Sequence, residues 1–172
     1  ATGSGTVTAF FKGVPMNEAF SFALANSNVG TGTNLGYNLT GNPYPSNIDL
    51  DTLYNLGNNK NNISATFYFW DNTVNSATTQ QGNGYNGAAY AVFNAAAGSA
   101  GTGLAAGSLS GNINGSKIPT RIVKTGQGFM VQSIEKVNKT LYFDNNIRTA
   151  DAGVGFFGNA SKGTVTASAD DR

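Results

Sequence analysis

The chain has 172 residues with a formal net charge of +1, and only 11% of its residues are charged, against roughly 25% in ordinary soluble domains. It contains no cysteine and no histidine, which excludes disulfides, metal sites built on Cys or His, Ser-His-Asp triads and imidazole catalysis within this chain. The basic residues are scattered singly, and no apolar stretch approaches the roughly 20 residues that a membrane helix needs. We therefore expect no enzyme, no nucleic-acid partner and no membrane insertion.

Alternating apolar and polar residues predict β-strands at the start of the chain. Residues 5–13 and 18–24 both alternate in this way, and residues 14–17 between them suit a hairpin connection. The sequence predicts a further short strand over residues 35–40. The two prolines of residues 41–46 (GNPYPS) forbid a continuing ladder. That run predicts a rigid corner, with a ligand-binding loop as the alternative.

Residues 47–56 carry the main helical signal of the chain. Ser46 or Asn47 is the expected N-cap. Asp49 and Asp51 then fall in the first turn, where the helix dipole favours acidic side chains. The segment predicts one to three helical turns.

Aromatic and β-branched residues are densest in residues 63–70, which predicts a central strand. Phe67 and Phe69 lie on one face of this strand, and Tyr68 and Trp70 lie on the other. Further short strands are predicted at residues 88–93, 120–124, 128–134, 139–143 and 163–167. The predicted core consists of Phe67, Phe69, Phe129, Val131, Leu141 and Phe143.

Residues 94–117 are built mainly of Ala, Gly, Ser and Asn, which suits a surface excursion with one weak strand near Leu104 or Ile113. Short strands, Gly- and Asn-rich turns and one short helix predict an all-β fold, namely an antiparallel, jelly-roll-like β-sandwich. A closed barrel is the alternative. We expect residues 1–158 to form this single domain, and residues 159–172 to be a terminal strand or the start of a following module or tail.

One run of the sequence resembles a known signature. Residues 37–49 (YNLTGNPYPSNID) are similar to the N-L-x-G-N-P-Y-P-S-x-I-D signature of large exported proteins of Flavobacteria and related Bacteroidetes. Similar blocks follow in the family's order at residues 69–71, 90–94, 126–131 and 141–148. Members of that family resemble β-rich modules, often placed upstream of a type IX secretion sorting domain. The resemblance implies export to the cell surface or the medium, and it implies no reaction.

Four aspartates are candidate calcium ligands, because carboxylates, Asn side chains and loop carbonyls are the natural ligands of this ion. They are Asp49, Asp51, Asp71 and Asp144. No EF-hand-like loop accompanies them. The alternative for Asp49 and Asp51 is that they stabilise the N-terminus of the predicted helix. No other cofactor is expected.

Four aromatic residues are candidates for a sugar-stacking platform of the kind that carbohydrate-binding modules use. They are Tyr68, Trp70, Tyr85 and Tyr90. The alternative is that they pack against each other across neighbouring strands. Thr52 lies in the run Asp51-Thr52-Leu53, which resembles the O-glycosylation sequon of Bacteroidetes.

Two functional hypotheses follow. The first is a non-catalytic structural or adhesive module of a secreted or cell-surface bacterial protein, which associates with neighbouring copies or modules. Residues 5–9 and 163–167 share the sequence GTVTA and few charges protect the strands, which suggests pairing between copies through edge strands. The alternative is that both strands pair within the same sandwich and that the repeat is a coincidence. The second hypothesis is a carbohydrate-binding module that recognises surface glycans.

Overall fold

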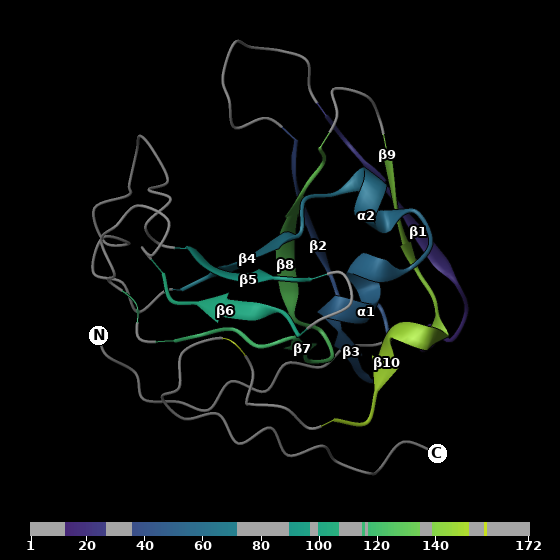
Figure 1. Cartoon of the computed structure of the whole chain (residues 1–172). Coiled ribbons are helices and arrows are strands. Elements are labelled where there is room, and N and C mark those ends of the chain that lie inside the picture. The colour runs from purple at the N-terminus through teal and green to yellow at the C-terminus, as the bar shows by residue number, and fades with distance from the viewer. Residues whose placement is uncertain are drawn as a thin grey trace, which may run out of the picture.

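The computed structural model describes residues 13–26, 36–71, 90–96, 100–106, 115, 117–134, 139–151 and 157. Short strands dominate these residues, and the pairings between named strands are antiparallel (Figure 1). The strands are β1 (Phe20–Leu24), β2 (Tyr37–Gly41), β3 (Asn47–Asp49), β4 (Thr66–Trp70), β5 (Tyr90–Asn94), β6 (Thr102–Leu104), β7 (Ile122–Val123), β8 (Gly128–Gln132), β9 (Lys139–Phe143) and β10 (Arg148–Thr149). The helices are α1 (Leu50–Asn55) and α2 (Asn59–Asn62), with a 3₁₀ turn at Asn145–Ile147. The predicted all-β, sandwich-like class and the short helix within residues 47–56 are confirmed.

The strands form three sheets around one hydrophobic core. The largest sheet has the order β2-β8-β4-β5-β6, and the smaller sheets have the orders β10-β3-β7 and β1-β9. Helices α1 and α2 lie between the five-stranded sheet and the β1–β9 pair (Figure 1). Leu50 and Leu53 of α1 are buried in the same core as Phe67 of β4 and Leu141 of β9. The helical segment therefore fills the space between two sheets.

The predicted core is confirmed, because each of its side chains is at most 2% exposed. Phe67 and Phe69 of β4 pack against Phe129 of β8, with ring centroids 5.7 and 6.2 Å apart. Burying a side chain of this size stabilises a fold by about 1.5–3 kcal/mol. The aromatic cluster is thus a main source of stability on the inner face of the five-stranded sheet.

The helix begins later than expected, and the predicted N-caps are wrong. Asp49 caps α1, because its carboxylate accepts a hydrogen bond from the Thr52 backbone N–H at 3.1 Å. Ser46 and Asn47 do not cap the helix, because Asn47 already lies in β3, which is held extended between β7 and β10. The weak strand expected near Leu104 is present as β6.

Other predictions concern residues that lie outside the described part of the chain. These are the strands at 5–12 and 163–167, the alternative weak strand near Ile113, and the terminal segment 159–172.

Strand β9 pairs with β1 along one edge. Along its other edge, asparagine side chains of α2 make the hydrogen bonds that a neighbouring strand would otherwise make. The Asn59 amide nitrogen donates to the carbonyl groups of Tyr142 and Leu53, each at 2.8 Å, and its oxygen accepts from the Tyr142 N–H at 2.9 Å. Asn62 donates to the Thr140 carbonyl at 2.7 Å. Helix α2 therefore satisfies backbone groups that would otherwise be buried without partners.

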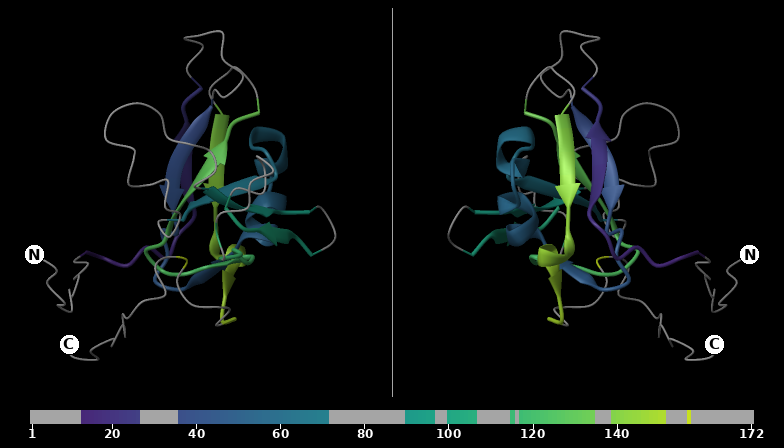
Figure 2. Two further views of the ribbon diagram at one scale, coloured as in Figure 1. Left: turned by 90° about the vertical axis from the view of Figure 1, so that its left-hand side faces the viewer. Right: turned by 90° about the vertical axis from the view of Figure 1, so that its right-hand side faces the viewer.

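A third asparagine joins β1 to β2, which run beside each other in Figure 2. The Asn38 side chain accepts from the Ala25 N–H at 2.8 Å and donates to the carbonyl groups of Ala25 and Gly36 at 2.9 and 2.8 Å. Gly36 has a φ of 94°, a conformation that non-glycine residues rarely adopt. This bridge ties the two sheets together at one corner.

The proline-containing run forms the rigid corner that the sequence predicts. The Asn42 side chain accepts from the Tyr44 N–H at 2.9 Å and donates to the Ser46 carbonyl at 2.6 Å. Tyr44 is 1% exposed and donates its hydroxyl to the Glu18 carbonyl at 3.0 Å. Tyr44 is therefore a core residue, so the ligand-loop alternative is wrong.

Candidate functional site

The second face of the five-stranded sheet is also rich in apolar and aromatic residues. Along β4, Phe67 and Phe69 point into the core, so Tyr68 and Trp70 point to the opposite side. We call the set of positions on that side the outer face. The strand registers place on it Tyr37, Leu39, Gly41, Thr66, Tyr68, Trp70, Tyr90, Val92, Asn94, Thr102, Leu104, Gly128, Met130 and Gln132.

A continuous row of large side chains crosses the outer face from one edge of the sheet to the other. Leu39 of β2 pairs with Met130 of β8, and Met130 pairs with Tyr68 of β4. Tyr68 pairs with Val92 of β5, which pairs with Leu104 of β6. We call these five residues the central row. It brings segments that are far apart in the sequence to one face of the sheet, where Val92 is buried and Leu39 and Leu104 at the two ends are exposed.

The outer face carries no charged residue at any of its positions. An antiparallel sheet with one solvated face normally alternates apolar and polar residues, with the polar ones outward. Leu39 is instead 71% exposed, and Tyr37 and Leu104 are each 37% exposed. Val92, in contrast, is only 1% exposed, so the exposed apolar side chains lie on the two edge strands of the sheet. Exposed apolar side chains that lie close together mark a candidate interaction site.

The aromatic residues of the outer face form two edge-to-face pairs. Tyr37 and Tyr68 have ring centroids 5.2 Å apart at an interplanar angle of 77°, and their hydroxyl oxygens are 3.5 Å apart. Trp70 and Tyr90 have centroids 5.1 Å apart at 74°. Three of the four residues predicted as a sugar platform are thus brought together, but through cross-strand packing. The fourth, Tyr85, lies outside the described residues.

Burial raises the pKa of the Tyr68 phenol well above its usual value, and the hydrogen bond with Tyr37 adds to the effect. Desolvation disfavours the charged phenolate, so Tyr68 stays neutral under physiological conditions. The centre of the outer face is therefore an uncharged hydroxyl that donates or accepts hydrogen bonds.

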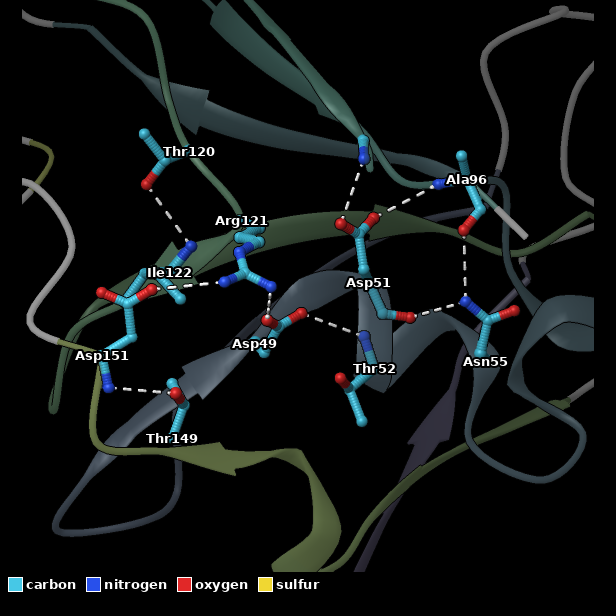
Figure 3. Close-up of polar contacts among 11 residues, drawn as sticks. Asp49, Asp51, Thr52, Asn55, Ala96, Thr120, Arg121, Ile122, Thr149 and Asp151 are labelled. Atoms are coloured by element: carbon cyan, nitrogen blue, oxygen red, sulfur yellow. Dashed lines mark hydrogen bonds and ion pairs between the residues drawn. The ribbon is translucent and has the colours of Figure 1, made fainter. Parts of the chain in front are cut away.

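The candidate calcium ligands of α1 have structural roles (Figure 3). Asp49, the cap of α1, also forms an ion pair with Arg121 at 2.9 Å. Asp51 accepts hydrogen bonds from the backbone N–H groups of Ala96 and Gly101 at 3.3 and 3.1 Å. These contacts tie α1 to the connection between β5 and β6. Both carboxylates are thus engaged in holding the fold.

The remaining aspartates lie elsewhere. Asp144 caps the 3₁₀ turn by accepting from the Asn146 N–H at 2.8 Å, and Asp71 is 1% exposed at the end of β4. No group of three acidic residues that would suit a metal ion occurs in the described part of the chain. Thr52, the candidate glycosylation site, is exposed on α1.

The residues of β2, β6 and β8 on the outer face were missed by sequence reasoning. Each of these residues, taken alone, looks like an ordinary exposed apolar residue. A signal was present in β2, where the outward Tyr37 and Leu39 are more apolar than the inward Asn38 and Thr40. A second signal was present in β4, where the outward positions are as aromatic as the inward ones. The order of the strands, which joins these residues, is not visible in the sequence.

Comparisons with known proteins give a family and no function. The family model described as Domain of unknown function (DUF8693) matches residues 1–172. No curated protein and no solved structure matches the chain. Among the described helices, none has the length and apolar character to cross a membrane. The chain belongs to the DUF8693 family.

Proposed function

We propose that this chain is a non-catalytic structural or adhesive module of a secreted or cell-surface bacterial protein, and that it docks a protein partner on its outer face. The observation that carries the proposal is the absence of charge across that face, combined with the exposure of Leu39, Tyr37 and Leu104. A sheet surface that met only water would be expected to carry polar and charged side chains.

The composition of the outer face favours a protein partner. The cores of protein interfaces are enriched in Tyr, Trp, Phe and Met and depleted of charged residues. The central row offers aliphatic side chains at both ends and Met130 and Tyr68 near its middle. Such a mixture complements another apolar protein surface.

A non-catalytic role agrees with how the described carboxylates are used. Asp49, Asp51 and Asp144 each accept hydrogen bonds from backbone N–H groups. Removing any of them from these contacts would leave a helix end or a loop without its cap. A glycoside hydrolase would instead need two carboxylates close to the same bond of the substrate, one as acid and one as base or nucleophile.

The proposed export rests on the sequence resemblance and on composition, and the signature residues themselves have structural roles. Asn42 and Tyr44 hold the corner, and Asp49 caps α1. The resemblance to exported modules therefore rests on residues that build the fold, so a shared fold is what it implies. The low content of charged residues is also typical of extracellular β-proteins.

A binding experiment tests the proposal. Fluorescently labelled chain is added to cells of a bacterium that encodes it, and Leu39→Lys is compared with wild type and with Val14→Lys. Val14 is 95% exposed and lies outside the named strands, so it controls for added charge. We expect Leu39→Lys to lose at least about tenfold in cell binding, which is roughly 1.4 kcal/mol, and Val14→Lys to bind like wild type. Equal binding by all three chains would refute docking through the outer face.

Carbohydrate binding is the second candidate, favoured by the paired rings of Trp70 and Tyr90 on the outer face. A glycan array separates the two functions. Retention on a defined glycan that is lost in Trp70→Ala, with Leu39→Lys still binding, would support the carbohydrate function. We expect no such retention, because the edge-to-face packing uses ring surface that a sugar would need.

A further inference from the structure

We infer that the β1–β9 pair carries a binding site for an arginine side chain of a partner protein. The site is a hollow of about 460 Å³ whose walls come from the start of β1, the end of β9 and the link between α1 and α2. The inference goes beyond the proposed function and does not depend on it, because no residue of the five-stranded sheet lines this hollow.

The walls of the hollow are mainly apolar and aromatic. Phe20 of β1, Tyr142 of β9 and Leu56 after α1 lie on them. Tyr142 is 44% exposed, and the other two side chains are partly exposed, so each offers surface to an occupant. The volume falls within the range of roughly 300–1,000 Å³ that is typical of ligand sites. One long side chain of a partner, with its neighbours, fits in such a space.

One end of the hollow is acidic. Asp144 belongs to its lining, and Glu18 lies one residue outside the lining. The segments that carry them run beside each other, because the Asn145 side chain donates to the Asn17 carbonyl at 2.8 Å. Both ion pairs of the described residues are made by Arg121. Within that part of the chain, neither Glu18 nor Asp144 therefore has an ion-pair partner, and the hollow favours a cation.

The Asp144 carboxylate has acceptor capacity left for such a cation. Its two oxygens each accept one hydrogen bond from Asn146, at 2.8 and 3.1 Å, whereas an ionised carboxylate accepts about four. Arg148 lies nearby, but its hydrogen bonds go to Ser46, Asn17 and Asn145. Its single charge offsets only one of the two carboxylates. A guanidinium group from a partner would therefore complete the hydrogen bonding of Asp144.

Arginine suits both the acidic end and the aromatic walls. Its planar guanidinium group pairs with a carboxylate through two parallel hydrogen bonds and also stacks on aromatic rings. A cation over the exposed ring of Tyr142 gains a cation–π contact. The apolar stem of the side chain can lie along Phe20 and Leu56. Lysine offers the charge without the planar surface, so we expect it to bind more weakly.

An NMR titration of the full chain with N-acetyl-arginine methylamide tests the inference. We expect the backbone amide resonances of Tyr142, Phe143 and Asp144 to shift and to saturate in the millimolar range. The matching citrulline derivative, which has nearly the same shape without the charge, should bind at least about threefold more weakly. Equal affinity for the two derivatives would overturn the inference, as would the absence of any shift up to the solubility limit of the arginine probe. A lysine derivative that binds more tightly would overturn arginine as the occupant.

Two variants locate the site. Asp144→Asn keeps a side-chain oxygen that can cap the 3₁₀ turn but loses the charge, and it should weaken binding of the arginine probe at least about threefold. Asp151→Asn, the control, removes the same charge from an exposed carboxylate outside the hollow and should bind like wild type. Tyr142→Ala should also weaken binding, with the amide spectrum establishing that it is folded. Unchanged binding in Asp144→Asn, or an equal loss in Asp151→Asn, would refute the site.

Free arginine separates a protein partner from a small-molecule ligand. An arginine residue within a protein chain has no charged amino or carboxyl group of its own, and the blocked derivative reproduces this state. Free arginine should therefore bind no more tightly than the blocked derivative. Tighter binding of free arginine would point to the amino acid itself as the ligand and would overturn the protein partner.

Discussion

Replacing Asn59 by alanine tests whether side-chain amides hold the two halves of the fold together. Asn59 is fully buried and makes three hydrogen bonds, with the Leu53 carbonyl and with both backbone groups of Tyr142. The methyl group of alanine replaces none of them. The carbonyl and the N–H of Tyr142 would then lose their partner between α2 and β9, and the Leu53 carbonyl would keep only the hydrogen bond from the Leu56 N–H at 3.3 Å.

The expected loss of stability is about 3–5 kcal/mol. Each hydrogen bond contributes a net of about 0.5–1.5 kcal/mol, and a buried group left unsatisfied costs about 1–3 kcal/mol. Partial entry of water and the better helix propensity of alanine offset a fraction of the total. A loss of this size is a large part of the 5–15 kcal/mol that stabilises an ordinary domain.

Urea denaturation followed by circular dichroism measures the effect. Asn55→Ala is the matched control, because Asn55 donates to two carbonyls on the exposed side of α1 and should change stability by no more than about 0.5 kcal/mol. We expect a lower midpoint for Asn59→Ala with an unchanged slope. A loss below about 1.5 kcal/mol would refute the structural role assigned to this amide.

Three further predictions concern the five-stranded sheet. Phe69→Ala should cost about 3–5 kcal/mol in the same denaturation assay, because it opens a cavity between two sheets; a loss below about 1 kcal/mol would contradict its place in the core. Gly103→Ala should destabilise the fold, since a Cβ atom there would lie 1.9 Å from the Pro119 carbonyl oxygen, whereas Gly128→Ala, with its nearest atom at 3.4 Å, should fold like wild type. Tyr68 should stabilise the protein fully below about pH 10 and progressively less above it, because its raised pKa keeps the phenol protonated only in the folded state. Between about pH 8 and pH 11, the urea midpoint of the wild type should therefore fall relative to that of Tyr68→Phe. An equal difference between the two midpoints at both pH values would contradict this.

The faces of individual strands were predictable because they depend on local alternation. In β4 the inward and outward positions follow directly from the order of Phe67, Tyr68, Phe69 and Trp70. All the predicted core residues are buried for the same reason. The N-cap of the helix was less predictable, because Asn47 lies in β3, which pairs with strands that are far away in the sequence.

The outer face as a whole and the asparagine contacts were not predictable. Tyr68 and Met130 become neighbours only once β8 is inserted between β2 and β4. Asn59 looks like an ordinary polar residue of a short helix, since its partner Tyr142 is 83 positions further along the chain. The candidate calcium ligands present a related difficulty, because an aspartate such as Asp49 has the same local sequence whether it caps a helix or binds a metal ion.

The fluorescence of Trp70 tests the central claim most directly, because it is the single tryptophan of the chain and lies on the outer face. If this face is the docking surface, binding to cells of a bacterium that encodes the chain should reduce the acrylamide quenching of 7-azatryptophan at position 70, which is excited apart from the tryptophan of the cells. In Leu39→Lys, quenching should stay as in the free chain. Binding of the wild type to cells with no change in the accessibility of residue 70 would contradict the account.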